Sequence, residues 1–261
     1  MANARKRGTV LVGLSGWSYP EWKPNFYAGV PQRRWLAHVA EHFPAVEVNL
    51  GYYRWQRRSA IEGWVSQTPP AFRFVAKGPR TITHRRRLKN IDDVLAQQID
   101  IYATFGNRLA AVLWQFPANF RKDGDRPERL AHFAELLDRT WSSVRHVIEF
   151  RHESWFDDDT ARCLARHRLV ACQSDAADWP MWDAVTTDLV YIRLHGHTRT
   201  YVSGYSRAAL ETWAQRVRAW RDEGRDVHVY FDNTAMGRAP RDARRFLELV
   251  RSSAQRARHA A

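Results

Sequence analysis

Six short apolar runs that end in polar residues constrain the fold of this chain more than any other feature. The runs are Val46–Asn49, Phe74–Lys77, Val112–Gln115, Val147–Arg151, Tyr191–His195 and Val229–Asn233. A strand that is covered on both faces is nearly continuous in apolar residues, whereas a strand with one wet face alternates. The repeated order, apolar first and polar last, therefore indicates parallel strands whose carboxyl ends meet at one polar rim.

Strand-like and helix-like segments alternate along the whole chain. Strands are predicted at 9–14, 45–50, 72–77, 109–116, 145–150, 169–174, 189–195 and 226–232. Helices are predicted at 32–43, 59–67, 91–105, 127–139, 157–167, 207–223 and 239–254. The connection from Asp175 to Asp188 contains Pro180 and is too short for a full helix. This order predicts a single (β/α)8 TIM-like barrel of the α/β class, with a short or missing helix between strands 6 and 7.

The length of 261 residues suits one barrel domain. We expect the barrel to span 8–251, with a flexible basic N-terminus at 1–7 and a frayed tail at 252–261. No apolar stretch approaches the roughly 18 residues of a membrane span, and the N-terminus lacks the apolar core of a signal peptide. Cys163 and Cys172 lack CxxC spacing, so reduced thiols and a cytoplasmic protein are expected, while the oligomeric state stays open.

The chain carries a formal net charge of +13, which would ordinarily suggest a nucleic-acid partner. Its 41 basic residues comprise 36 Arg and only 5 Lys, a bias that a GC-rich coding sequence also produces. The segment 80–89 is denser in charge than a uniform excess would give, and His84 lies within it. Weak nucleic-acid binding by this segment and a simply solvated loop are both open interpretations.

Residues two apart on a strand share a face, which pairs Glu149 with Arg151 and Arg193 with His195. If these faces turn inward, the mouth of the barrel can bind an anion through arginine while Glu149 or His195 transfers a proton. The other interpretation is that Glu149 with Arg151, and Glu47 with Arg193, are internal ion pairs that fill the barrel without chemistry.

Further candidate ligand contacts follow the predicted strands. The polar candidates besides Arg151 and Arg193 are Glu47, Asn49, Lys77, His84, Gln115, Asp232 and Asn233. The aromatic candidates are Trp17, Tyr53 and Trp155, because each follows a predicted strand closely enough to line the mouth and stack on a ligand. Glu47, Glu149, Asp175, His195 and Asp232 could supply metal ligands, but their spacing matches no metal motif, so no cofactor is expected.

The ordered motifs of the chain resemble the YecE-like family, domain of unknown function 72. The motifs are Gly16–Trp22, Val46–Asn49, Tyr53, Phe72–Phe74 with Lys77, Thr83–His84, Gln115–Pro117, Glu149–His152 with Ser154–Trp155, Arg193–Gly196, and Tyr230–Phe231 with Asn233. The resemblance covers about 8–251 and implies a TIM-barrel fold without an established activity. The family's last strand usually ends in two asparagines, and Asp232 replaces the first of them, which exchanges an amide for a group that only accepts hydrogen bonds.

Three functions are compatible with these residues. The favoured one is an enzyme of hydrolase or lyase type that acts on an anionic small molecule, for example a phosphorylated one, at the carboxyl-end mouth. The first alternative is a barrel that binds or processes nucleic acid. The basic charge and the aromatic residues near the strand ends support this alternative. The second is a glycoside hydrolase with Glu47 and Glu149 as its carboxylate pair.

Overall fold

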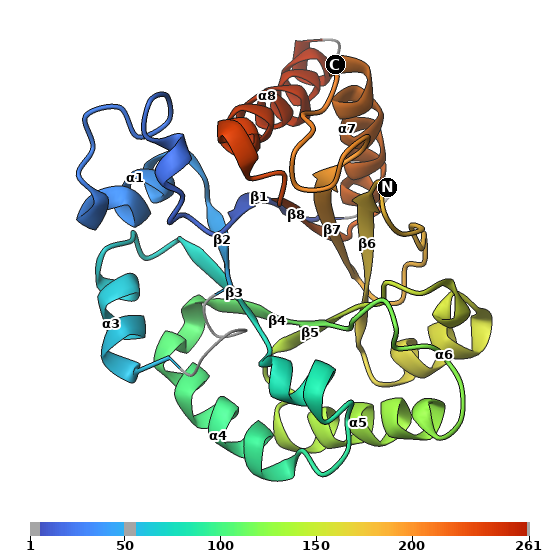
Figure 1. Ribbon diagram of the computed structural model, residues 1–261. Helices are drawn as coiled ribbons and strands as arrows, with labels where there is room; N and C mark the ends of the chain where they lie inside the picture. Colours follow the sequence, from blue (N-terminus) through green and yellow to red (C-terminus); the bar gives the residue numbers. More distant parts are fainter. Residues whose placement is uncertain (1–5, 50–55, 260–261) are drawn as a thin grey trace.

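A computed structural model describes residues 6–49 and 56–259 of the chain, with only the backbone described from 252 to 259. Eight parallel strands close in chain order into a barrel, and β1 pairs with β8 to complete it (Figure 1). The strands are β1 (Val10–Ser15), β2 (Ala45–Val48), β3 (Arg73–Lys77), β4 (Leu109–Gln115), β5 (Arg145–Glu149), β6 (Val170–Ala176), β7 (Leu189–Gly196) and β8 (Asp226–Phe231). The predicted (β/α)8 barrel is confirmed.

Helices surround the barrel on its outer side (Figure 1). They are α1 (Trp35–His42), α3 (Arg58–Ser66), α4 (Asp92–Tyr102), α5 (Arg126–Thr140), α6 (Asp158–Arg166), α7 (Arg207–Asp222) and α8 (Arg238–His259). The connection between β6 and β7 contains no helix, as its length and Pro180 predict. Helix α8 continues past its predicted end at 254, and the frayed tail at 252–261 stays a prediction. No helix within the described residues is long and apolar enough to cross a membrane.

Apolar side chains fill the interior of the barrel toward the amino ends of the strands. The interior cluster consists of Ala45, Val75, Ala111, Leu113, Val147, Val170, Cys172, Leu189, Tyr191 and Tyr230. Since side chains on one strand face recur every second residue, the next inward positions toward the carboxyl ends are the polar ones. The barrel is therefore a packed apolar plug with a polar layer above it, at the end where TIM-barrel active sites lie.

The register of the strands aligns this polar layer. Ser15 is the partner of Glu47 across β1 and β2, and Gln115 is the partner of Glu149 across β4 and β5. Arg193 on β7 is paired with Ser174 on β6. Polar residues that are distant in sequence therefore lie at one level of the barrel.

Candidate active site

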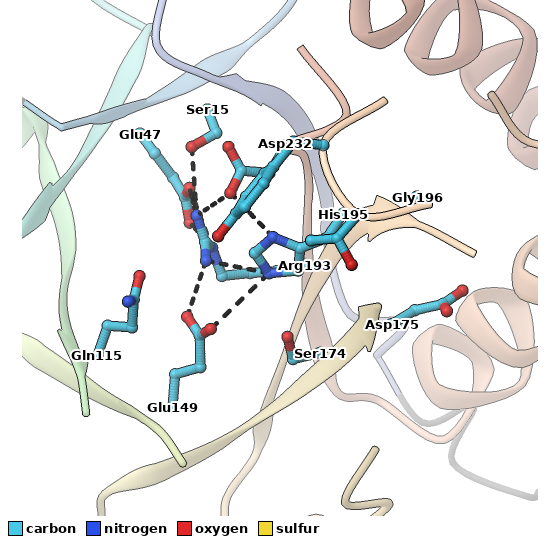
Figure 2. Close-up of polar contacts among 12 residues, drawn as sticks. Ser15, Glu47, Gln115, Glu149, Ser174, Asp175, Arg193, His195, Gly196 and Asp232 are labelled. Atoms are coloured by element: carbon cyan, nitrogen blue, oxygen red, sulfur yellow. Dashed lines mark hydrogen bonds and ion pairs between the residues drawn. The ribbon is translucent and has the colours of Figure 1, made fainter. Parts of the chain in front are cut away.

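The guanidinium of Arg193 lies at the centre of the polar layer (Figure 2). Its Nε and Nη2 donate to Glu47 at 2.9 and 3.0 Å, its Nη1 donates to Glu149 at 2.8 Å, and its Nη2 also donates to Asp232 at 2.9 Å. Ser15 Oγ accepts a further, longer bond of 3.3 Å. All three guanidinium nitrogens are used, and the side chain is fully buried. Arg193 thus organises the layer, and the expectation that it binds substrate is wrong because no donor is left for a ligand.

Glu149 joins the buried centre of the layer to the edge of the mouth. Its Oε2 accepts from Arg193, and its Oε1 accepts from Arg151 Nε at 2.9 Å. Burial alone would raise the pKa of Glu149, but Arg193 and Arg151 outweigh it and hold the pKa well below its usual range. The carboxylate is consequently ionised and bound on both oxygens, which suits it to holding positive charge better than to accepting a proton.

His195 is held in one neutral tautomer by its two neighbours. An arginine can only donate, so Nε2 of His195 accepts from Arg193 Nη1 at 3.1 Å. The ring proton is then on Nδ1, which lies 2.9 Å from Asp232 Oδ2. Burial and the nearby Arg193 lower the pKa of His195, in agreement with a neutral ring. Asp232 Oδ2 accepts from Arg193 and lies beside Nδ1 of His195.

Lys77 closes the cluster on the β3 side. Its Nζ donates to Gln115 Oε1 at 3.0 Å, and both side chains are buried. Burial, followed by the charge of Arg193, lowers the pKa of Lys77 to about 8. Of the three cations Lys77, Arg151 and Arg193, Lys77 is the one whose pKa lies near neutral pH.

The charges of the layer balance. Its carboxylates are Glu47, Glu149 and Asp232, and its cations are Lys77, Arg151 and Arg193. Three negative and three positive charges sum to zero while Lys77 is protonated. An anion that enters the mouth therefore meets no net repulsion, and loss of the Lys77 proton makes the layer negative.

Arg151 lies at the edge of the layer, where the mouth opens. Its guanidinium carbon is 4.0 Å from the centre of the Trp179 ring, and its Nη2 donates to the hydroxyl of Tyr201 at 3.2 Å. The Trp179 indole in turn donates to Ser174 and packs edge-on against the His195 ring. Tyr201 is 40% exposed, so this side of the mouth is open to solvent. The stack fixes the planar guanidinium of Arg151 beside the opening.

His84 lies close enough to Arg151 and Lys77 to feel their charges. It belongs to a π-helical turn, Thr81–Arg85, that follows β3, and its Nδ1 is 2.9 Å from Thr83 Oγ1. Burial and the nearby Arg80 and Arg151 lower its pKa to about 4, so the ring is neutral at neutral pH. His84 is therefore near the side of the mouth that carries Arg151.

Two sequence predictions fail because the side chains point elsewhere. Trp155 is fully buried outside the barrel, stacked on Phe120 and Phe150, and its indole donates to the Phe120 carbonyl at 2.7 Å. It cannot stack on a ligand. Asn233 donates to Asp242 Oδ2 at 2.9 Å and to the carbonyl of Ser203. Its amide therefore ties the β8 end to α8 and does not reach the polar layer.

The β1 side of the mouth carries a small hollow of about 130 Å³. It is lined by Gly16, Trp17, Ser18, Tyr19 and Asn49. Asn49 donates to Ser15 Oγ at 3.1 Å, which connects the hollow to the Arg193 cluster. Trp17 lines this hollow and packs edge-on against Trp64. Tyr53 lies outside the described residues.

Sequence reasoning omitted three residues that shape the site: Ser15, Tyr191 and Tyr201. Tyr191 donates to Glu47 at 2.5 Å, and its position two residues before Arg193 on the same strand face could have revealed it. Ser15 is the polar residue at the end of the apolar run of β1, and this position could have revealed it in the same way as the other strand-end residues. Tyr201 lies on a loop, where no periodicity indicates the direction of a side chain.

Volume alone does not identify the site. A larger cavity of about 530 Å³ lies at the opposite end of the barrel, where Val144, Arg145 and Asp188 line it close to the starts of β5 and β7. Amino-end residues of TIM barrels serve stability, whereas catalytic groups come from carboxyl ends. Convergence of charged groups therefore favours the mouth.

The carboxylates considered as metal ligands at the mouth are engaged by other side chains. Arg193 binds Glu47, Glu149 and Asp232, and Asp175 is directed toward His197 and Trp213.

A closed parallel barrel with a buried charged layer at its carboxyl end defines a TIM-barrel protein. Within that class, the family model described as protein of unknown function DUF72 matches residues 11–261. The chain therefore belongs to the DUF72 family, which confirms the resemblance of its motifs.

The relatives align with between 56% and 93% of this chain. The UPF0759 protein YunF of Bacillus subtilis (strain 168) is 23% identical over 272 aligned positions, covering 92% of this chain and 94% of YunF. The UPF0759 protein YecE of Escherichia coli (strain K12) is 29% identical over 147 positions, 56% of this chain and 50% of YecE. The crystal structure of a DUF72 family protein from Thermotoga maritima MSB8 superimposes with a TM-score of 0.83 at 25% identity, covering 93% of this chain and 99% of that one. Family membership establishes the fold and no activity.

Proposed function

We propose that the barrel mouth is the active site of an enzyme of hydrolase or lyase type that acts on an anionic small molecule. The observation that carries this proposal is the arrangement of Arg151, which is held by Glu149 and Trp179 at the opening of a charge-balanced buried layer. A guanidinium offers a rigid fork that matches carboxylate or phosphate oxygens. An anion bound by Arg151 would lie above the rest of the layer.

Proton transfer is assigned to Lys77. The sequence suggested Glu149 or His195, but Glu149 is ionised and bound on both oxygens, and the His195 lone pair is occupied by Arg193. Lys77 has a pKa of about 8, close to the value at which a general base or acid is effective at neutral pH. In this scheme Arg151 positions the anion, Lys77 exchanges the proton, and Glu149 holds Arg151 in place.

A glycoside hydrolase is less well supported. Retaining and inverting enzymes need their two carboxyl groups on opposite sides of a sugar bond. Here the guanidinium of Arg193 lies between Glu47 and Glu149 and binds both (Figure 2). No sugar can occupy that space, so this pair is not the catalytic pair of such an enzyme.

Binding of inorganic phosphate, the simplest probe of the anion site, tests the first half of the proposal. Arg151→Lys keeps the charge but loses the fork, so we expect phosphate affinity to fall about tenfold, the equivalent of one lost charge-assisted hydrogen bond. Arg145→Lys is the matched control, because Arg145 makes a two-pronged pair with Asp188 far from the mouth. Titration calorimetry measures the phosphate affinity of both variants. Equal phosphate affinity in Arg151→Lys and Arg145→Lys would contradict the anion site.

Turnover tests the second half. A panel of phosphorylated and carboxylated compounds that raise the melting temperature of the protein supplies candidate substrates. For any compound that is turned over, Lys77→Met should lower kcat at least about a hundredfold, the usual size of a general acid–base contribution. Retained turnover in Lys77→Met with intact folding would exclude Lys77 as the proton-transfer group.

A further inference from the structure

A second group of ligating side chains lies on α1, outside the mouth. His38 and His42 are one helical turn apart, and their ring centroids are 4.4 Å from each other. Glu41 Oε2 lies 3.4 Å from Nδ1 of His38. One ligating atom from each of the three residues comes within 4.8 Å of the other two, and no other such group of three occurs in the part of the chain that the structure describes.

Backbone carbonyls hold both imidazoles in the tautomers that a metal needs. Nε2 of His38 is 2.8 Å from the carbonyl oxygen of Phe26, and Nδ1 of His42 is 2.8 Å from the carbonyl oxygen of His38. A carbonyl only accepts, so these nitrogens carry the ring protons. The lone pairs are then on Nδ1 of His38 and Nε2 of His42. Metal-bound histidines characteristically donate their other N–H group in this way, which fixes the ring and strengthens the ligand.

We propose that His38, Glu41 and His42 bind one divalent transition-metal ion of the zinc type. Two imidazole nitrogens and one carboxylate oxygen suit zinc better than the hard ions magnesium and calcium, which take oxygen ligands. Tetrahedral coordination with bonds of about 2.0 Å needs ligand atoms about 3.3 Å apart. Glu41 Oε2 already lies 3.4 Å from His38 Nδ1, close to that spacing, and its side chain is 56% exposed.

The surrounding charges leave the metal-facing oxygen available. Arg34 lies 3.7 Å from Oε1 of Glu41, the oxygen that does not face His38, and so supports the carboxylate from behind. On the other side, Arg244 of α8 lies over the Phe26 ring at 5.2 Å and opposes a cation. The Phe26 ring also packs against both imidazoles and covers one side of the site.

The ion would link α1 to the connection between β1 and α1, because the Phe26 carbonyl holds one of its ligands. This role differs from the proposed chemistry of the mouth, since none of the three ligands belongs to the Arg193 layer. The proposed metal site therefore does not depend on the proposed function of the mouth.

Zinc titration of the full chain, purified without a histidine tag and freed of metal by a chelator, tests the site. Competition with a chromophoric chelator should give one Zn²⁺ per chain. Glu41→Gln, His38→Ala and His42→Ala should each weaken binding at least about tenfold. His132→Ala, at an exposed position on α5, is the matched control and should bind as the wild type does. Substitution of Co²⁺ should give the intense visible absorption of a tetrahedral site, and this absorption should be lost in Glu41→Gln.

Glu41→Gln keeps the test decisive if the histidine variants unfold, because its side chain is largely exposed and packs little. Circular dichroism establishes which variants are folded. Wild-type affinity for Zn²⁺ equal to that of Glu41→Gln and His38→Ala would overturn the proposal. So would zinc binding that survives in the three α1 variants but is lost in Glu149→Gln, because the ion would then lie in the mouth.

Discussion

Glu47 and Arg193 form a two-pronged ion pair within the barrel, at Nε–Oε1 and Nη2–Oε2 distances of 2.9 and 3.0 Å. Neither side chain is exposed to solvent. Taking two charges out of water is costly, and the pair persists because each charge is satisfied by the other and by further hydrogen bonds. Removing one member would leave the other buried without its counter-charge.

Glu47→Gln is therefore expected to lower the free energy of unfolding by about 3–5 kcal/mol. Asp188→Asn breaks another two-pronged pair, with Arg145 at the surface, and the expected loss is at most about 1 kcal/mol. Urea unfolding of both variants measures the difference. Similar losses in the two would show that burial of the Glu47 pair does not matter for stability.

Lys77→Met should change how stability depends on pH. The folded-state pKa of Lys77 is about 8, whereas the unfolded value is the ordinary 10.5. Between these values the unfolded chain binds the proton and the folded chain does not, so the Lys77 contribution to stability rises as pH increases from 8 to 10.5. Relative to Lys77→Met, the wild type should gain up to about 3 kcal/mol over this window. Urea unfolding at several pH values checks this, and a constant difference would contradict a depressed pKa.

His146→Gln should make the protein less sensitive to acid. The imidazole accepts from Trp114 Nε1 at 3.2 Å and donates to the Trp141 carbonyl at 2.9 Å, contacts that a Gln amide can replace. Burial lowers the pKa of His146 to about 4, so the unfolded chain takes up the proton first as pH falls below 6.5. Wild-type stability is then lost between pH 6.5 and 4, by up to about 3 kcal/mol from this residue. The loss between pH 7 and 5 should be smaller in the variant, and equal losses would refute the assignment.

Trp155 and Trp179 should behave oppositely on substitution by alanine. Trp155→Ala removes a fully buried ring and should cost about 3–5 kcal/mol of unfolding free energy. Trp179→Ala removes the platform beneath Arg151 and should cost only about 1–2 kcal/mol while weakening phosphate binding. Thermal unfolding and phosphate titration separate the two. Unchanged phosphate affinity in Trp179→Ala would show that the stack does not position Arg151.

Nucleic-acid binding should be weak and independent of sequence, since the basic charge offers phosphate contacts without a reading motif. Fluorescence anisotropy with single- and double-stranded oligonucleotides should show an affinity whose logarithm falls linearly with log salt between about 50 and 200 mM. Arg85→Glu, at an exposed position in the basic segment, should weaken it further. Tight binding that survives high salt would instead favour a nucleic-acid function.

The sequence by itself determined the barrel, the missing helix after β6 and the polar rim. Each of these follows from local patterns: a strand repeats every two residues, and burial on both faces demands apolar runs. The same period correctly paired Glu149 with Arg151 and Arg193 with His195 on inward faces, as their mutual contacts show.

Only the tertiary structure decided which polar groups meet. Glu47 and Arg193 are 146 positions apart, and the closure and register of the barrel bring them together. Closure of the barrel gives every guanidinium nitrogen of Arg193 a protein acceptor. It also leaves Arg151 at the opening and places Lys77 among the buried charges. Loop side chains such as Trp155 and Trp179 have no period to indicate their direction, so packing alone sends one beneath the helices and the other to the mouth. The pKa values and the remaining donors depend on burial and neighbours, which are properties of the folded chain.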